Sequence, residues 1–193
     1  MHYKQFFFIL IMGTLLLCYL PSKAQDVKLE KVQVNKSLRL SLPKDFMLMP
    51  EQEIRAKYIS YRDPLAIYTN QSRTVDLGIN LSVTHWEPND LEIMQQFYEN
   101  SIQALYTEVD FLKKDIESVD GIRFAVFEFI STVIDEESIV NRSPAISKYT
   151  LIYYGIVNNK TILFNFTCPA NEKDTWQNTA HAIMNSIQIK KTL

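Results

Sequence analysis

Glycine is scarce in this chain of 193 residues, which contains four. Beyond residue 24 the glycines are Gly78, Gly121 and Gly155, far apart in the sequence. Phosphate-binding loops, dinucleotide-binding turns and the nucleophile elbow of hydrolases all need closely spaced glycines, which let the backbone turn sharply. The sequence therefore excludes these three kinds of site.

Cysteine and histidine are also few. Beyond residue 24 the chain has Cys168, His85 and His181, with no C-x-x-C or H-E-x-x-H motif. The segment His85-Trp86-Glu87 supplies half of a zinc deaminase signature, but the P-C-x-x-C half is absent. We therefore expect no metal, no cofactor and no internal disulfide. A calcium site at Asp135-Glu136-Glu137 is an alternative, although a solvated acidic loop is favoured there.

An excess of basic residues is missing as well, because the formal net charge is −2 at pH 7. Proteins that bind nucleic acid usually carry a stripe of lysine and arginine that neutralises phosphates. The charge balance therefore excludes nucleic acid as a partner, and it argues equally against anionic membrane surfaces.

The first 24 residues predict a cleavable secretory signal peptide. A short basic start precedes an apolar run over 6–20, and the small residues Ser22 and Ala24 precede the expected cleavage before Gln25. A membrane anchor is the alternative. The apolar run ends at Pro21, however, and is shorter than the roughly 20 residues that a spanning helix needs.

Residues 25–193 are expected to form one domain, with 47% hydrophobic residues in the chain to build its core. Asn80 and Asn165 begin N-x-Ser/Thr triplets inside strand-like runs, where a glycan fits poorly. We therefore expect an exported bacterial protein, periplasmic or extracellular. No further apolar run long enough to span a membrane follows the signal.

Alternating or continuous apolar runs predict strands at 38–42, 65–69, 77–83, 109–119, 122–131, 147–157 and 160–168. Asp120-Gly121 and Asn158-Asn159 predict two tight hairpins, since these residues tolerate a positive φ. Apolar stripes and turn residues predict helices at 51–58, 89–106 and 171–187, with Asn89 as N-cap and Glu92 completing a capping box.

The strand at 122–131 is apolar on both faces. Phe124 and Val126 lie on one face, and Phe127 and Phe129 lie on the other. Such a strand has to be covered on both sides. We therefore predict an α+β fold, an α/β/α sandwich in which an antiparallel sheet of about six to seven strands is covered by helices on both faces.

The order of these elements resembles the PsbP/Mog-like superfamily, including DcrB-like bacterial envelope proteins. The resemblance is carried by the Leu-x-Leu-Pro-Lys-Asp-Phe segment at 40–46, the antiparallel meander and the Ser-Ile-x-Ile run at 186–189. It implies an α/β/α sandwich that binds or assists and does not catalyse. The sequence departs from the often lipidated DcrB-like proteins, because no small residue directly precedes Cys18.

Candidate binding residues are polar or aromatic positions that interrupt the apolar pattern. Glu128 and Asn165 lie in strands, and a buried carboxylate must be paired or protonated. Glu128 could line a polar pocket with Asn165 or Tyr153, or a Lys, Arg or Tyr of a covering helix could pair with it. Trp86, between a strand and a helix, is either a lid over the edge of the core or a contact point. The segment 132–146 is a further candidate partner surface.

Cys168 could be a nucleophile, but it shares a strand face with Phe164 and Phe166, which predicts a small buried hydrophobe. We therefore expect no catalytic residues. The function predicted is a non-catalytic, exported or envelope binding or accessory module. It would act as a monomer, with an envelope protein or a small ligand as partner. The alternatives are a hydrolase with a dispersed Ser/His/Asp set and a self-associating surface protein.

Overall fold

The computed structural model describes residues 27–58, 63–82, 84–134 and 145–190. The predicted signal peptide, Val83 and the acidic segment Asp135-Glu136-Glu137 lie outside these ranges. None of the helices in the described part of the chain is both long enough and apolar enough to span a membrane.

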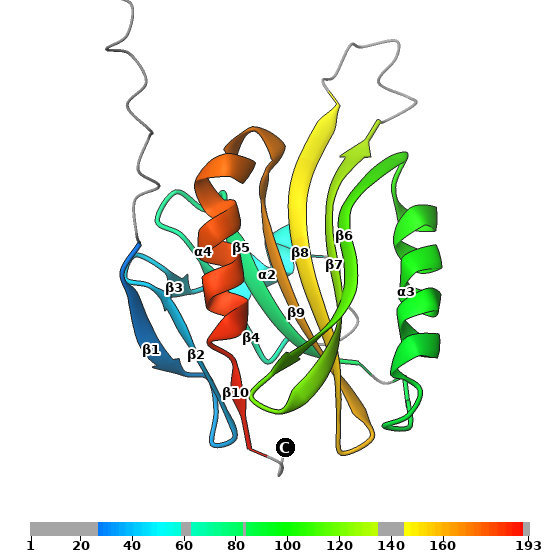
Figure 1. Cartoon of the computed structure of the whole chain (residues 1–193). Coiled ribbons are helices and arrows are strands. Elements are labelled where there is room, and N and C mark those ends of the chain that lie inside the picture. Colours follow the sequence, from blue (N-terminus) through cyan, green and yellow to red (C-terminus); the bar gives the residue numbers. More distant parts are fainter. Residues whose placement is uncertain (1–26, 59–62, 83, 135–144, 191–193) are drawn as a thin grey trace, which may run out of the picture.

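A seven-stranded antiparallel sheet organises the molecule (Figure 1). Its strands, in sheet order, are β3 (Met47–Leu48), β4 (Ala66–Thr69), β5 (Asp76–Leu81), β9 (Lys160–Pro169), β8 (Ile146–Val157), β7 (Ile122–Val133) and β6 (Glu108–Val119). Every pair of neighbouring strands is antiparallel. The predicted sheet type and strand number are therefore confirmed.

The two predicted hairpins are present. Asp120 and Gly121 have φ of 53° and 74°, and Asn158 and Asn159 have φ of 51° and 58°. Two consecutive positive φ values match the twist of the flanking strands, which is why hairpins favour Asn, Asp and Gly at these positions. The hairpins fix the order β6-β7 and β8-β9 within the sheet.

Strand β6 contains a β-bulge. Phe111 pairs with Phe129 and Lys113 pairs with Glu128, so Leu112 is an extra residue without a partner on β7. Phe111 lies on the α3 side of the sheet, where its ring contacts Phe129.

Helices cover the sheet on both faces, as expected (Figure 1). α4 (Lys173–Asn185), preceded by the 3-10 turn Ala170–Glu172, lies on one face and packs on Phe166 and Tyr153. α3 (Leu91–Leu105) lies on the other face and packs on Phe127 and Tyr154. The sheet therefore separates two hydrophobic clusters, an α4-side cluster and an α3-side cluster.

A second, three-stranded sheet was not predicted. It consists of β1 (Leu29–Gln33), β2 (Leu38–Pro43) and β10 (Gln188–Ile189), and it lies beside α4 (Figure 1). The strand predicted at 38–42 therefore joins this small sheet, and short β3, which was not predicted, forms one edge of the main sheet. The charged residues of β1 and the shortness of β3 and β10 leave little periodicity to detect.

The start of α3 also differs from the expectation. Its N-cap is Asp90 and not Asn89, and no side chain caps it. Asp90 Oδ2 instead accepts a hydrogen bond from the backbone N–H of Glu87 at 3.0 Å. Glu92 forms an ion pair with Arg123, so the predicted capping box is absent. The third helix, α2 (Glu51–Lys57), follows Pro50 as predicted.

Candidate functional site

Glu128 is a buried carboxylate on the α4 side of the sheet, 4% exposed. Its Oε1 accepts hydrogen bonds from the Tyr149 hydroxyl at 2.8 Å and from Gln177 Nε2 at 2.6 Å, and its Oε2 lies 3.2 Å from His181 Nε2. Gln177 and His181 come from α4, and Tyr149 comes from the neighbouring strand β8. The expected Lys or Arg partner is therefore replaced by His181, and the Tyr comes from a strand and not from a helix.

These contacts keep Glu128 ionised. Burial alone raises its pKa, but hydrogen bonds from His181, Tyr149 and Gln177, together with the electrostatic interaction with His181, lower it to about 2. Burial, together with the same carboxylate, raises the pKa of the Tyr149 hydroxyl well above its usual range. This arrangement satisfies a buried charge and joins α4 to the sheet.

A histidine held by a carboxylate is part of the dispersed Ser/His/Asp alternative. Among the described residues, however, no serine or cysteine forms a hydrogen bond with His181. Cys168 is fully buried on the α4 side, and burial raises the pKa of its thiol to about 12. The described part of the chain therefore shows no activated nucleophile next to this histidine.

Tyr153 lies on the same face as Glu128 but forms a separate contact. Its hydroxyl donates a hydrogen bond to Glu117 Oε2, and Glu117 also forms an ion pair with Lys113. The ring is fully buried against Phe124.

Asn165 lies on the opposite face of the sheet from Glu128. Asn165 pairs with Ile152 and Phe166 pairs with Leu151, which in turn pairs with Glu128. Directly paired residues point to the same face and adjacent residues point to opposite faces. Glu128 and Asn165 therefore cannot share a pocket, so this predicted grouping is wrong.

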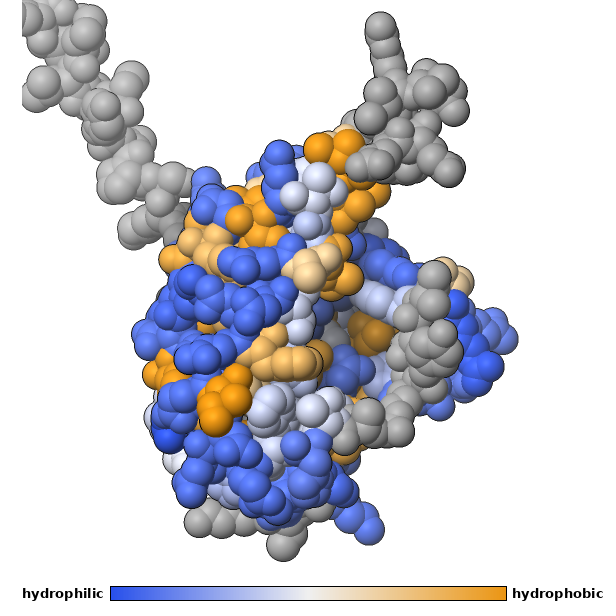
Figure 2. All heavy atoms as spheres, turned by 90° about the vertical axis from the view of Figure 1, so that its right-hand side faces the viewer, coloured by the Kyte–Doolittle hydropathy of each residue, from blue (hydrophilic) through white to orange (hydrophobic). Residues whose placement is uncertain are grey.

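Asn165 instead lines a cavity of about 600 Å³ on the α3 side of the sheet. The cavity lies where α3 ends, between Tyr106 and the short helix α2, and its floor is formed by β5, β9 and β8. Figure 2, which views the molecule from the α3 side, shows the surface hollowed between the main body and the α2 region. A volume of this size is typical of small-molecule sites.

The floor of the cavity is mostly polar. Thr150 pairs with Thr167, which pairs with Asp76, and these three side chains form a row across β8, β9 and β5. Asn165 and Gly78 form the next row of paired residues. Ile54, Pro64, Ile67 and Val133 contribute apolar parts of the wall.

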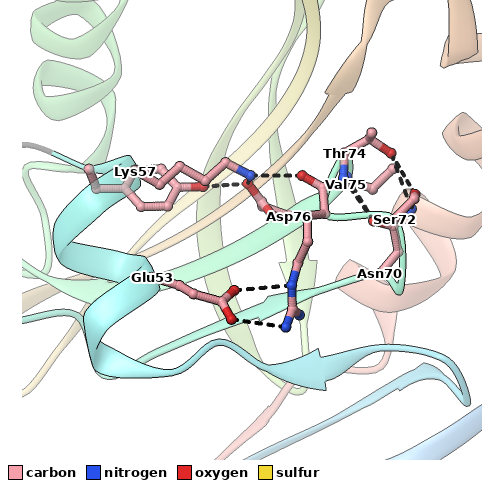
Figure 3. Close-up of polar contacts among 9 residues, drawn as sticks. Glu53, Lys57, Asn70, Ser72, Thr74, Val75 and Asp76 are labelled. Atoms are coloured by element: carbon pink, nitrogen blue, oxygen red, sulfur yellow. Dashed lines mark hydrogen bonds and ion pairs between the residues drawn. The ribbon is translucent and has the colours of Figure 1, made fainter.

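Asp76 connects the floor to α2 (Figure 3). Its Oδ2 accepts a hydrogen bond from the Tyr58 hydroxyl and lies 2.6 Å from Lys57 Nζ. Glu53 forms a second link through an ion pair with Arg73 at 3.0 Å. Because α2 has no buried residue, these polar contacts hold the wall of the cavity in place.

Two side chains that line the cavity each carry a buried oxygen atom that has no hydrogen-bond partner among the described residues. They are Oδ1 of Asp76, a residue that is 5% exposed, and Oδ1 of Asn165. A buried polar atom without a partner costs free energy, and native proteins contain few of them. A hydrogen-bond donor that reached these atoms from the cavity would satisfy both.

Gly78 gives the cavity its depth. A Cβ at this position would lie 3.6 Å from Asn80 Nδ2 and 3.9 Å from the Asn165 carbonyl oxygen, which are ordinary contacts. The backbone therefore accepts a side chain here, and the glycine leaves space above the floor.

Trp86 lies apart from both groups. It is half-buried at the edge of the α3-side cluster, and its ring is 5.8 Å from that of Phe97. Its indole N–H has no partner among the residues that the structure describes. Both roles predicted for Trp86, a lid over the edge of the core and a contact point, stay predictions. In the segment 132–146, β7 extends to Val133 and β8 begins at Ile146, and the intervening 135–144 lie outside the described residues.

Sequence reasoning identified Asn165 but missed the rest of the cavity. Asp76, Thr150 and Thr167 are short polar residues in strands that must be covered on both faces. Their shared face would have been a usable signal, but it requires the order and register of the strands, which the sequence alone does not provide.

No protein-family model matches the sequence, and no curated protein is significantly similar to it. Solved structures do resemble the fold. Cyanobacterial PsbP (CyanoP) from Synechocystis sp. PCC 6803 has a TM-score of 0.58 at 10% identity, covering 85% of this chain and 94% of CyanoP.

Two further structures are similar at comparable levels. LpqN, involved in cell envelope biogenesis of Mycobacterium tuberculosis, has a TM-score of 0.53 at 13% identity, covering 84% of this chain and 91% of LpqN. The Ran-binding protein Mog1p of Saccharomyces cerevisiae has a TM-score of 0.53 at 11% identity, with coverages of 84% and 96%. The chain therefore has the PsbP/Mog-like fold that its sequence resemblance implied.

Proposed function

We propose that this chain is a non-catalytic binding module that acts outside the cytoplasm, and that the cavity beside α2 holds a small ligand. The observation that carries the proposal is that two side chains lining a cavity of about 600 Å³, Asp76 and Asn165, each have an oxygen, Oδ1, without a partner among the described residues. A small ligand with hydrogen-bond donors would remove the cost of leaving them unpaired.

The contacts of His181 and Cys168 support a binding role over a hydrolytic one. His181 pairs with buried Glu128, and the Cys168 thiol is fully buried. The fold offers the same support by analogy, since Mog1p is a Ran-binding protein. Labelling the folded protein with reactive probes for serine and cysteine nucleophiles tests the point. We expect no labelling without denaturant, and rapid labelling at one residue would favour the dispersed enzyme.

Export is proposed from the N-terminal 24 residues and from the likeness to LpqN, a protein of cell envelope biogenesis. Amino-terminal sequencing of protein recovered from its host should begin at Gln25. A chain that still begins at Met1 would contradict export. The mass of the purified domain in solution separates the expected monomer from a self-associating surface protein.

Native mass spectrometry of protein purified gently from its own host tests the ligand. We expect an additional mass on the wild-type protein that is absent from Gly78→Val, which places a side chain in the cavity. Gly78→Ala is the matched control, because it changes the same backbone but adds only one methyl group. A ligand retained equally by Gly78→Val would place the binding site elsewhere.

A further inference from the structure

The cavity combines unpaired acceptor oxygens with a nearly neutral floor, and this combination restricts the chemistry of its ligand. Resting on the proposed function, we infer that the ligand is an uncharged polyol, such as a short saccharide, which donates several hydroxyl groups to the floor. Four features support the inference: the acceptors, their spacing, the charges and the walls.

The unpartnered atoms require donors. Asp76 Oδ1 can only accept hydrogen bonds, and Asn165 can accept through its carbonyl and donate through its amide. A hydroxyl group donates and accepts at once, so it suits both side chains. A purely apolar chain would leave Asp76 Oδ1 and Asn165 Oδ1 unsatisfied and more deeply buried.

The spacing suits several hydroxyl groups in one molecule. Asp76, Thr167 and Thr150 are directly paired across three strands, and paired side chains have Cβ atoms about 4.5–5.5 Å apart. Asn165 lies two residues from Thr167 on the same face of β9. Neighbouring hydroxyl groups on a sugar ring can therefore contact adjacent members of this row.

The charges disfavour ions. The carboxylate of Asp76 already has Lys57 at 2.6 Å and the Tyr58 hydroxyl, so a cation would compete with an existing partner. An anion would be repelled by the carboxylate of Asp76 on the floor. Among the described lining residues the other charged side chain is Lys148, which is exposed at the rim. A neutral ligand has no such cost.

The walls provide apolar surface for the carbon skeleton of a sugar. Tyr58, just after α2, and Tyr106, just after α3, both line the cavity, and Ile54 and Ile67 add aliphatic side chains. Aromatic rings have an apolar face and a polar tip, and they suit ligands that are themselves part apolar and part polar.

The test is an NMR titration of the mature protein with glucose, N-acetylglucosamine, maltose and trehalose. Inorganic phosphate and decanoate are the charged and acyl comparison probes. We expect saturable shifts of the backbone amides of Gly78, Thr150 and Thr167 with at least one saccharide. The same amides should not respond to phosphate or decanoate.

Two variants localise the effect. Asn165→Val removes an acceptor and donor of the floor, and it should weaken saccharide binding about tenfold, the loss expected for one hydrogen bond of about 1.4 kcal/mol. Glu128→Gln changes the opposite face of the sheet and should leave the affinity unchanged. If Asn165→Val binds the saccharide with the affinity of the wild type, the placement of the saccharide on this floor is wrong.

The outcomes separate the ligand class from the binding function. Shifts at the cavity with decanoate or phosphate, and none with any saccharide, would overturn the polyol and leave the cavity as a binding site. If no probe shifts the cavity amides and native mass spectrometry shows no retained mass, the proposed binding function fails with it.

Discussion

At the scale of single residues, Glu128 makes the stability of the domain depend on pH in the acidic range. Its pKa is about 2 in the folded protein against 4.5 for the ordinary side chain, so folding favours the ionised form. The ionised carboxylate therefore stabilises the folded state. Its contribution to the unfolding free energy is complete above pH 4.5 and is lost as the pH falls from 4.5 to 2. A shift of this size corresponds to about 3 kcal/mol as an upper value.

Chemical denaturation of the wild type and Glu128→Gln at several pH values measures the effect. The difference in unfolding free energy should be about 1–3 kcal/mol at pH 7, because the amide introduced by the substitution offers no charge to Tyr149 and Gln177. It should shrink progressively below pH 4.5. A constant difference from pH 7 to pH 2.5 would show that Glu128 is not ionised in the folded protein.

Two glycines of the main sheet should respond oppositely to alanine. At Gly155 a Cβ would lie 2.6 Å from Cε1 of the fully buried Phe124 ring, so Gly155→Ala should destabilise the fold by about 1–3 kcal/mol. At Gly78 a Cβ would make only ordinary van der Waals contacts, so Gly78→Ala should be neutral or slightly stabilising. Thermal unfolding of both variants provides the comparison, and equal melting temperatures would contradict the assigned packing of Phe124.

Cys168 should resist modification in the folded protein. Its side chain is fully buried, so a reagent cannot reach the sulfur atom. Burial also raises the pKa of the thiol to about 12, so little of the reactive thiolate forms. Iodoacetamide should label it only after denaturant is added. Labelling of the native protein at the rate of a free thiol would show that the region around β9 opens readily.

At the scale of elements, α2 differs from α3 and α4 because polar contacts rather than burial hold it. Its ion pairs with β5 and the preceding turn are Lys57–Asp76 and Glu53–Arg73. Without them α2 has no buried side chain to keep it on the sheet. The wall of the cavity therefore depends on these two contacts.

Asp76→Asn should loosen α2 selectively. Hydrogen exchange of the amides of 51–57 should accelerate, while that of β7 and β8 stays slow, because the core strands do not depend on this contact. Glu51→Ala is the control, since its partner Arg55 is exposed and lies within the same helix. Unchanged exchange in Asp76→Asn would mean that other contacts hold the helix.

For the whole molecule, the part of the fold that could be predicted is the part governed by local patterns. Strands such as β7 are apolar on both faces, so both faces of the sheet have to be covered. This requirement predicted the layered α+β architecture. Asp120-Gly121 and Asn158-Asn159 gave the hairpins. Strand β2 was predicted, but the small sheet that it joins was not, because Leu38, Leu40 and Leu42 indicate one buried face but not which neighbours the strand pairs with.

The candidate site could be predicted only in part, for the same physical reason. Glu128 and Asn165 were identified because they interrupt apolar strand patterns, but the faces on which they lie depend on the register across three strands. The cavity results from α3 ending at Leu105 and from α2 covering the adjacent part of the sheet, both of which are tertiary features. Asp76 therefore gave no signal of its own in the sequence.

Because of its bulge, strand β6 should tolerate the loss of one residue at a defined position. Odd-numbered residues of β6 face α3 up to Phe111, and even-numbered residues face α3 from Lys114 onward, because Leu112 absorbs one position. Deleting Leu112 would join two segments that already have matching faces, so the shortened chain should still fold and unfold cooperatively. Deleting Val126 from β7 would turn every following side chain to the opposite face and should abolish folding. Deletion of a single codon should therefore be tolerated in β6 at this one position and rejected in the strand beside it.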